Sequence, residues 1–569
     1  MIDINKIPFS RYGSFITISP IWEDDKNELY IRSVRGGDTN EGYGKIFKIQ
    51  SINENGEVIP YSVNMTEIEL TLETNEGKVC FCIENKSNLR VYGENIGLRL
   101  SMETSSYDNA MSLSKSRCRV NSFTNDIKFM ITTLEGYLRV DAPWDISHSE
   151  YVIIDIYPEN KRNSFSGVIE EFKTVWEQKE YIKSYFDVLE DIKREYREWS
   201  EKALKLPERY NEGKKLANYI TWSCVVPSGG RLTRPAMYMS KNWMTNIWSW
   251  DNCFNAMALV HKNPELAWDQ LMIFFDIQDE SGVLPDFVND KYEYFSCTKP
   301  PIHGWAIDYM IKHRPDFFNE EKLKQIYGPL SKWTKYWFKY TTNDESGIPS
   351  YSHGNDAGWD NSTVFSRGMP LKSPDLLSFL IMQMKTLGNI ADKLEDKKHH
   401  AYWEDRVEES LKRLVDYFWT GKKFVPRKDN VIEDEFDGDS LIMFIPIILG
   451  NMLPKNIIGK LVDGLKEEGR FLTKYGLATE SLKSKYYKED GYWRGPIWAP
   501  ATMLIVDGLC RVGEYDFAKD ISKRFVEMAN INGMAENFNA ETGEGLRDKA
   551  FTWTSSVFLI LGNMLLDMQ

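Results

Sequence analysis

Long apolar runs and an excess of positive charge are both missing from this chain, and each absence excludes a class of protein. No apolar run approaches the roughly 20 residues that cross a bilayer, and the N-terminus has no basic segment followed by an apolar one. Acidic residues outnumber basic residues by 84 to 70, which gives a formal net charge of −14. Because binding to phosphate backbones needs a basic face, nucleic acid is excluded as the main partner. We expect a cytoplasmic protein with no membrane partner.

Metal-binding patterns are also scarce. Only one pair among the seven cysteines is close, Cys80 and Cys82, and it does not have the spacing of a zinc site. We interpret all seven cysteines as reduced and mostly buried. The seven histidines contain one adjacent pair, His399 and His400, in a charged segment that faces solvent. The sequence therefore predicts neither a metal nor another cofactor, and it leaves the oligomeric state open.

The 569 residues are enough for more than one domain. From about 28 to 160, short runs alternate apolar and polar residues, as in EIELTLE at Glu67–Glu73, with turn residues between them. This pattern predicts an antiparallel β-sandwich over residues 1–165. Residues 166–205 are charged and have apolar positions at helical spacing, which predicts a helical linker.

From residue 206 to the end, helical patterns recur at intervals of roughly thirty residues. The twelve predicted helical segments span residues 216–226, 254–260, 265–277, 304–312, 323–340, 376–393, 402–418, 440–449, 457–467, 500–511, 515–530 and 553–566. Twelve helices without intervening strands suit six helical hairpins that close into a ring. The predicted fold is therefore mostly α, with a helical domain over 206–569 behind the sandwich.

Tryptophan is concentrated in this helical part, where 14 of the 18 tryptophans lie. In its polar loops, three of them adjoin a charged residue: Trp250 beside Asp251, Trp359 beside Asp360, and Trp493 beside Arg494. Sugars stack their C–H faces on aromatic rings and donate hydroxyls to charged groups. The three pairs therefore predict tryptophans that line a carbohydrate site. The alternative is that the rings fill a large helical core.

Two stretches supply the carboxyls that glycoside hydrolysis requires. The loop SHGNDAGWDNSTVFSR, residues 352–367, holds Asp356 and Asp360 among turn-forming residues, and the stretch after Met534 begins with Glu536. They can meet only if the helices close into a ring. Read on its own, the loop equally fits a surface segment whose acids cap a helix. Asp356 competes for the role of acid, and Glu541 and Glu544 compete for the role of base.

Five motifs occur in order and carry a family resemblance. They are WSWDNCF (248–254), KPPIHGWA (299–306), GWDNS (358–362), YWRGPIW (492–498) and ENFNAETG (536–543). Together they resemble glycoside hydrolase family 63 and its relatives, the bacterial mannosylglycerate and glucosylglycerate hydrolases. The chain is more distantly similar to trehalases through SGGRL at 228–232. The resemblance covers about 218–566 and not the N-terminal domain.

The resemblance implies an (α/α)6 barrel and an inverting mechanism in which Asp360 is the general acid and Glu536 the general base. It also implies that Asp251 and Arg494 hold sugar hydroxyls. We count Trp250, Trp359, Trp493, Trp498, Asn361 and Trp553 as further substrate contacts. In an inverting enzyme the two carboxyls should lie roughly 6.5–9.5 Å apart, with Asp360 partly desolvated and Glu536 ionised.

The leading hypothesis is an inverting, exo-acting α-glycosidase that cleaves an α-glucoside, either a small oligosaccharide or a glucosyl conjugate. The first alternative is hydrolysis of glucosylglycerate or mannosylglycerate, for which Arg231, Arg234 and Lys241 could hold the glycerate carboxylate. The second is an inactive sugar-binding protein. A lyase or phosphorylase is disfavoured, since a phosphorylase replaces the base with an anion site and Glu536 is present.

Overall fold

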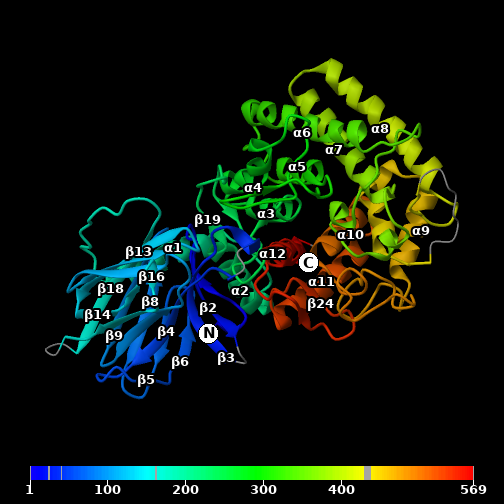
Figure 1. The fold of residues 1–569 in the computed structure, drawn as a ribbon. Helices are drawn as coiled ribbons and strands as arrows, with labels where there is room; N and C mark the ends of the chain where they lie inside the picture. The colour runs from blue at the N-terminus through cyan, green and yellow to red at the C-terminus, as the bar shows by residue number, and fades with distance from the viewer. Residues whose placement is uncertain (1, 24–25, 40–41, 160–162, 429–436, 568–569) are drawn as a thin grey trace.

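Alternating apolar residues build two eight-stranded antiparallel sheets in the N-terminal part of the chain (Figure 1). The computed structural model describes residues 2–23, 26–39, 42–159, 163–428 and 437–567. The first sheet contains β1 (Phe9–Ser10), β2 (Ile16–Glu23), β3 (Lys26–Ser33), β4 (Lys45–Ile52), β10 (Gly97–Met102), β17 (Val152–Tyr157) and β14 (Tyr137–Asp141) in this order, with β5 (Val58–Ile59) beside β4. The second contains, in order, β11 (Asn109–Ser114), β12 (Arg117–Ser122), β13 (Ile127–Glu135), β18 (Ser164–Phe172), β9 (Asn88–Glu94), β8 (Lys78–Ile83), β7 (Leu70–Glu73) and β6 (Ser62–Met65).

The two sheets share one apolar core. Leu98 and Leu100 pair with Ile156 and Ile154 in the first sheet, and all four side chains are buried. Across the sheets, the rings of Phe47 and Phe129 meet edge to face with centroids 5.3 Å apart. The period of two that is visible in the sequence thus places one face of each strand in this core.

The segment after residue 165 is mostly not helical, which corrects the predicted boundary and linker. β18 continues to Phe172, because its Val168 and Ile169 are buried in the sheet core. A single helix follows, α1 (Tyr185–Glu201), which begins at a capping box formed by Ser184 and Asp187. Its apolar residues pack on β9 and on the first helix of the next part.

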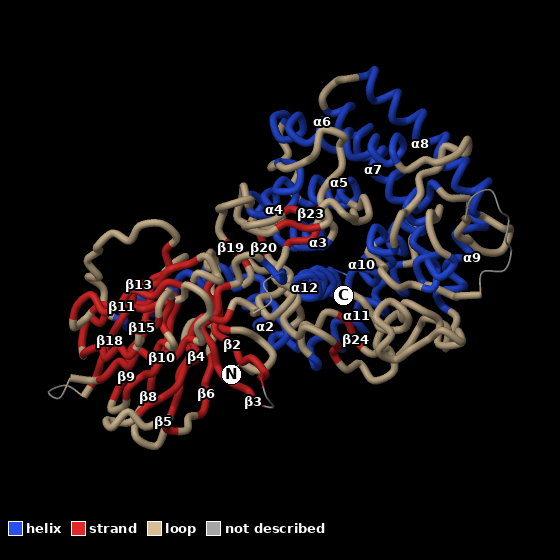
Figure 2. Tube along the Cα trace, viewed as in Figure 1, coloured by secondary structure: helices blue, strands red, loops and turns tan. Residues whose placement is uncertain are grey.

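Although the segment 216–226 extends into β19 (Val225–Val226), each of the twelve predicted helical segments overlaps a helix. They are α2 (Asn211–Ser223), α3 (Asp251–Leu259), α4 (Pro264–Asp276), α5 (His303–His313), α6 (Glu320–Tyr340), α7 (Pro374–Lys393), α8 (Lys397–Phe418), the 3₁₀ segment η5 (Leu441–Met452), α9 (Lys455–Lys466), α10 (Ala499–Arg511), α11 (Tyr515–Asn532) and α12 (Thr552–Asp567). The chain is therefore a mixed helix-and-sheet protein, with sheets first and helices after (Figure 2).

Every second helix belongs to an inner layer that closes on itself. α3 packs on α5, α5 on α7, α7 on η5, η5 on α10, α10 on α12, and α12 returns to α3. The inner helices are buried on almost all sides, whereas outer helices such as α6 and α8 bury one stripe and expose charged residues on the other. Among the described residues, no helix combines the length and apolar character of a membrane span.

Short antiparallel strands stand in the loops at the entrances of inner helices, where no strand was predicted. They are β19 (Val225–Val226) with β20 (Ala236–Met237), β21 (Ile247–Trp248) with β22 (Phe287–Val288) and β23 (Glu293–Tyr294), and β24 (Asn537–Phe538) with β25 (Gly545–Leu546). Pairs of two residues are too short for a periodic signal in the sequence. They brace the loops that carry the polar motifs.

Candidate active site

Five polar residues stand in the loops that lead into inner helices. They are Asp251 at the start of α3, Lys299 before α5, Asp360 before α7, Tyr492 before α10 and Glu536 before α12. Because outer and inner helices alternate along the chain, each inner helix begins at the same end of the ring. The five loops therefore meet at one mouth of the ring, although they are far apart in the sequence.

A buried ion pair forms one side of this mouth. Nζ of Lys299 lies 3.3 Å from Oδ1 of Asp286, and Nδ2 of Asn355 donates to Oδ2 of Asp286 over 2.7 Å. Burial opposes the charge of Lys299, but the surrounding carboxylates raise its pKa above the ordinary value. These carboxylates belong to Asp286, Asp360 and Asp251. Lys299 is therefore a fixed cation among three acids from three different loops.

Asp251 carries a carboxylate oxygen that the protein leaves unsatisfied. The side chain is buried, and its Oδ2 has no hydrogen-bond partner among the residues that the structure describes. Burial raises the pKa of Asp251 well above its ordinary value; Lys299 opposes this effect, while Asp286 and Asp360 add to it. Leaving a buried oxygen unpaired costs about 1–3 kcal/mol. Such an oxygen is suited to accept a hydrogen bond from a ligand.

Asp360 sits on a loop that closely approaches a buried tryptophan. The preceding Gly358 has a φ of 69°, and a Cβ at this position would lie 2.5 Å from Cζ2 of Trp250. Glycine is therefore required there both for the backbone conformation and for space. Asp360 is partly exposed at the mouth, and its partial desolvation stays a prediction.

Asn361 and Arg494 connect this loop to the turn before α10. Nδ2 of Asn361 donates to the carbonyl of Gly491 over 3.0 Å, and its Oδ1 accepts from the backbone of Trp493 over 2.9 Å. Nε of Arg494 donates to the carbonyl of Asn361 over 2.6 Å. The amide of Asn361, predicted to contact substrate, is thus engaged with the protein, where it fixes the position of Asp360.

Glu536 is the more deeply buried of the two predicted catalytic acids. It is 4% exposed, and burial raises its pKa to about 8, with the charge of Asp548 adding to the effect. Arg547, a backbone hydrogen bond from Asp548 and the hydroxyl of Tyr492 all act in the opposite direction. Burial is thus the largest influence on the pKa of the predicted base.

Tyr492 lies near both predicted catalytic acids. Its hydroxyl is close to the carboxylate of Glu536, and each of the two groups shifts the pKa of the other. Burial raises the pKa of this phenol, and the charges of Glu536, Asp360 and Asp251 add to the effect. The Tyr492 phenol is therefore within electrostatic range of the carboxylates of Asp251, Asp360 and Glu536.

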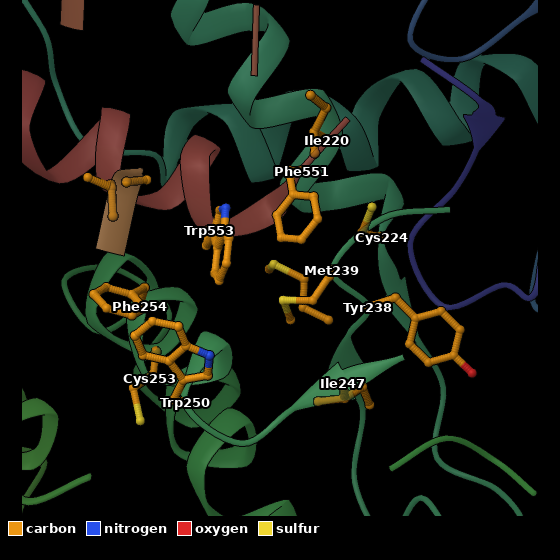
Figure 3. Packing of buried hydrophobic residues seen from close by; sticks show 14 of the residues in the cluster. Ile220, Cys224, Tyr238, Met239, Ile247, Trp250, Cys253, Phe254, Phe551 and Trp553 are labelled. Atoms are coloured by element: carbon orange, nitrogen blue, oxygen red, sulfur yellow. The ribbon is translucent and has the colours of Figure 1, made fainter. Parts of the chain in front are cut away.

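The five candidate tryptophans form a single buried block. Trp493 stacks on Trp498 at 3.9 Å and packs 4.7 Å from Trp359, while Trp250 and Trp553 meet edge to face at 5.8 Å. Each of the five is at most 4% exposed. Figure 3 shows Trp250 and Trp553 within the packed core. The structure thus favours the core alternative, because the rings satisfy their faces with one another.

Two of these tryptophans position the site through their indole N–H groups. Nε1 of Trp498 donates to the carbonyl of Tyr492 over 2.9 Å, and Nε1 of Trp553 donates to the carbonyl of Glu536 over 3.2 Å. The substrate contacts predicted for Trp250, Trp359 and Trp493 stay predictions, and the structure adds a packing role for the three rings.

Replacing Trp493 with alanine should destabilise the fold and not only weaken ligand binding. Trp493 contacts three other tryptophans, and removing a fully buried large aromatic costs about 3–5 kcal/mol. Trp243→Ala is the matched control, since Trp243 is 44% exposed. Denaturant unfolding of both variants checks the prediction. Equal stabilities for the two variants would show that the block does not support the fold.

The competing acids Asp356, Glu541 and Glu544 lie in other surroundings than the predicted pair. Asp356 is buried and accepts hydrogen bonds from the backbones of Thr298, Ser352 and His353, so it holds the loop together. Glu541 and Glu544 are exposed on the turn between β24 and β25. Among the candidate acids, Asp360 and Glu536 both raise the pKa of Tyr492.

The three cations considered for a glycerate carboxylate are engaged elsewhere. Arg234 pairs with Asp269 and Asp276, and Arg231 lies 3.4 Å from Glu293. Lys241 is buried at the junction with the sheets, where Nζ donates to the carbonyl of Ser14 over 2.6 Å. Burial lowers the pKa of Lys241 to about 7. The predicted carboxylate site is therefore not formed by these residues.

The N-terminal sheets support the loop that carries Glu536. Asp548 accepts from Ser240 Oγ over 3.0 Å and from Asn242 Nδ2 over 3.1 Å, and its carbonyl accepts from the backbone of Glu536 over 2.8 Å. Arg32, on β3, donates to the carbonyl of Asn242 over 2.6 Å. A chain of hydrogen bonds thus connects the first sheet to the predicted base.

Sequence reasoning did not select Asp286, Lys299 or Tyr492 as site residues. Lys299 and Tyr492 begin two of the motifs that carry the family resemblance, so their position was a usable signal. Asp286 lies in the segment LPDFVND, which is not part of any of the five motifs. It precedes β22, which pairs with β21, and its carboxylate lies beside Lys299.

Residues 244–554 match the family model of the mannosylglycerate hydrolase MGH1-like glycoside hydrolase domain. The glucosylglycerate hydrolase of Mycolicibacterium hassiacum is 22% identical over 410 residues, which cover 55% of this chain and 91% of that protein.

Two solved structures resemble the fold. The GH63 mannosylglycerate hydrolase of Thermus thermophilus in complex with glucose aligns with a TM-score of 0.53 and 16% identity, covering 62% of this chain and 99% of that one. A bacterial glucoamylase complexed with acarbose aligns with a TM-score of 0.62 and 11% identity, covering 100% of this chain and 94% of that one. The glucoamylase likeness therefore includes the N-terminal sheets, which the sequence resemblance did not reach.

Proposed function

This chain belongs to the family of MGH1-like glycoside hydrolases, and on that premise we propose that it is an inverting, exo-acting α-glycosidase that hydrolyses a small α-glucoside. The observation that carries the proposal is that the loops with Asp360, Tyr492 and Glu536 lie at the same end of the ring of inner helices. The charges of both acids raise the pKa of Tyr492, which supports their proximity. Two carboxyls around one space are what glycoside hydrolysis needs.

In the proposed mechanism, Asp360 donates a proton to the oxygen of the departing group while Glu536 removes a proton from the attacking water. The partial exposure of Asp360 suits a group at the entrance, where the aglycone leaves. Tyr492 and Arg547 lower the pKa of Glu536, but burial outweighs them, so Glu536 takes the ionised form that a base requires only toward alkaline pH. We expect the two carboxyls to lie roughly 6.5–9.5 Å apart, with the water between them.

We propose that the helical part, from α2 to α12, is an (α/α)6 barrel that holds the active site, and that the two sheets up to β18 form a β-sandwich domain. The segment with α1 joins them. The closed contact path of the inner helices and the shared core of the sheets support this division.

The alternative, hydrolysis of glucosylglycerate or mannosylglycerate, is supported by the names of the relatives. It needs a cation for the glycerate carboxylate. Lys299 and Arg494 lie at the mouth and are the remaining candidates, because Arg231, Arg234 and Lys241 are engaged elsewhere.

Incubating the enzyme with α-linked glucosides, α-mannosides and glucosylglycerate, and following the released sugar by ¹H NMR, tests the proposal. We expect hydrolysis of at least one α-glucoside, with the β-anomer of glucose appearing first and mutarotating later. Initial release of α-glucose would contradict inversion. Turnover of glucosylglycerate alone would select the alternative.

Arg494→Lys should lower kcat/KM by about tenfold or more. A guanidinium can hold the Asn361 carbonyl through Nε and still present planar donors to a sugar hydroxyl, whereas one ammonium cannot do both. Steady-state kinetics on the best substrate measures the effect, with Arg524→Lys as a control at a site on α11 of similar exposure. An unchanged kcat/KM in Arg494→Lys would show that Arg494 does not hold a sugar hydroxyl.

A further inference from the structure

Asp548 is a second buried carboxylate in the loop of the predicted base. It is 1% exposed, and its Oδ1 accepts hydrogen bonds from Ser240 Oγ over 3.0 Å, from Asn242 Nδ2 over 3.1 Å and from the backbone of Ala550 over 2.9 Å. The backbone of Trp243 donates to Oδ2 over 3.4 Å. All four partners are neutral donors, and an ionised carboxylate only accepts hydrogen bonds. These surroundings suit a carboxylate that keeps its charge in the interior.

Asp548 and Glu536 are joined across one hairpin. The backbone of Glu536 donates to the carbonyl of Asp548 over 2.8 Å, next to the paired strands β24 and β25. The two arms pack closely, because a Cβ at Gly545 would lie 2.7 Å from Cβ of Ala535. Arg547 bends the second arm with a φ of 61°, a left-handed conformation that is strained for a residue with a side chain. The hairpin therefore holds Asp548 in a fixed place relative to the backbone of Glu536.

Two opposite charges from this hairpin act on the carboxyl of Glu536. After burial, the charge of Asp548 is the largest cause that raises the pKa of Glu536, and the charge of Arg547 opposes it. A backbone hydrogen bond from Asp548 and the hydroxyl of Tyr492 also lower this pKa. Arg547 is itself paired with Asp490 over 2.7 Å. The carboxylate of Asp548 thus strengthens Glu536 as a proton acceptor.

The first sheet holds the donors of Asp548 in place. Arg32 on β3 is 2% exposed, and its Nη2 donates to the carbonyl of Asn242 over 2.6 Å. Its Nη1 donates to Ser19 Oγ on β2 over 2.8 Å. The charge of Asp548 raises the pKa of Arg32 against the larger effect of burial, so the guanidinium is within electrostatic range of that carboxylate. Asp548 therefore acts on a cation of the first sheet as well as on Glu536.

We propose that Asp548, held by Arg32 of the first sheet, is a positioning residue for the general base, because its carbonyl fixes the backbone of Glu536 and its carboxylate places a permanent negative charge nearby. The inference rests on the proposed glycosidase function and deepens it, since it makes the N-terminal sheets part of the catalytic arrangement. Being buried, Asp548 acts through Glu536 and not on the substrate.

Asp548→Asn tests the charge with little change of shape, because the amide oxygen can keep the three hydrogen bonds that Oδ1 accepts. Only the long bond from the backbone of Trp243 to Oδ2 is lost. The variant is made in the Asp360→Asn background and assayed with α-glucosyl fluoride, whose fluoride leaves without protonation, so the rise of kcat/KM with pH reports Glu536. We expect this rise to shift to lower pH, because the charge of Asp548 raises the pKa of Glu536. A weaker base should also give a lower kcat/KM at the alkaline plateau.

Arg32→Lys tests the connection to the first sheet. One ammonium cannot replace the planar fork that bonds the carbonyls of Asn242 and Tyr43 together with Ser19 Oγ. A displacement of about 1 Å at a catalytic group can cost about 10²-fold in rate. In the otherwise unmodified enzyme we therefore expect kcat to fall about tenfold to 10²-fold while KM changes little.

The Arg99–Asp155 pair supplies matched controls for both variants. Asp155 on β17 is 4% exposed, and its Oδ1 lies 2.7 Å from Nε of Arg99 on β10 in the same sheet. Because this pair bonds within the first sheet, Asp155→Asn should leave the pH dependence in place, and Arg99→Lys should leave kcat unchanged.

A pH dependence that stays in place or moves to higher pH in Asp548→Asn overturns the inference, and so does an unchanged kcat in Arg32→Lys. Circular dichroism compares the folds, and Arg32→Lys decides alone if Asp548→Asn does not fold. Failure of the proposed function is distinguishable, because the unmodified enzyme would then turn over neither α-glucosyl fluoride nor any glucoside of the panel.

Discussion

Asp360→Asn should abolish the hydrolysis of ordinary α-glucosides while sparing α-glucosyl fluoride. The amide cannot protonate a departing sugar oxygen, and general-acid catalysis contributes about 10²- to 10⁴-fold. Fluoride leaves without protonation, so its release needs only the base and the water. Asp360 is partly exposed on a loop, and the exchange is isosteric, so the fold should stay intact. The measurement is kcat/KM on both substrates, with circular dichroism to compare the folds.

Glu536→Gln should abolish turnover of both substrates, because activating the water is required in each case. Glu541→Gln, an exposed glutamate in the same segment, is the control and should behave as the unmodified enzyme. The opposite pattern, in which Glu536→Gln retains fluoride turnover and Asp360→Asn does not, would reverse the two roles. Burial favours a protonated carboxyl, and Glu536 is the more deeply buried acid, so this reversed pattern is the result that would contradict the proposed assignment.

The helices were predictable because their signal is local. Outer helices carry an apolar pattern of period 3.6, and inner helices are apolar at most positions, all within their own residues. Asn319 and Ser184 provide capping signals at two helix starts. The prediction of a helix over residues 166–172 was wrong because a buried central strand such as β18 and a buried helix can both contain a short apolar run. Only pairing with β9 and β13, which is not local, distinguishes them.

The surroundings of the acids were not predictable to the same degree. The motifs identified Asp360 and Glu536, but burial depends on which other loops reach the mouth. Glu536 owes its environment to Asp548, which in turn is held by a loop anchored on Arg32, more than 500 positions away. Likewise, the sequence pattern of a tryptophan beside a charged residue does not distinguish a ring that contacts a sugar from a ring that packs against another indole.

Because of Glu536, the kcat/KM of the enzyme should rise with pH over an unusually alkaline range. Burial raises its pKa to about 8, so the carboxyl is protonated below that pH and ionised above it. A general base acts only when ionised, so its activity should rise about tenfold per pH unit below 8 and level off above. In the unmodified enzyme the general acid contributes a limb of its own, and the two limbs combine. The Asp360→Asn variant with α-glucosyl fluoride isolates Glu536, and its kcat/KM from pH 5.5 to 9.5 reports this single group.

A charge change next to Glu536 should move this limb in a predictable direction. Arg547 lowers the pKa of Glu536, so Arg547→Gln in the Asp360→Asn background should shift the limb to higher pH. Arg524→Gln removes an arginine of similar exposure from α11 and should leave the limb in place. A limb near the ordinary glutamate value of about 4.5 in all these variants would show that Glu536 is ionised in the resting site. A limb at 8 that ignores Arg547 would belong to another group.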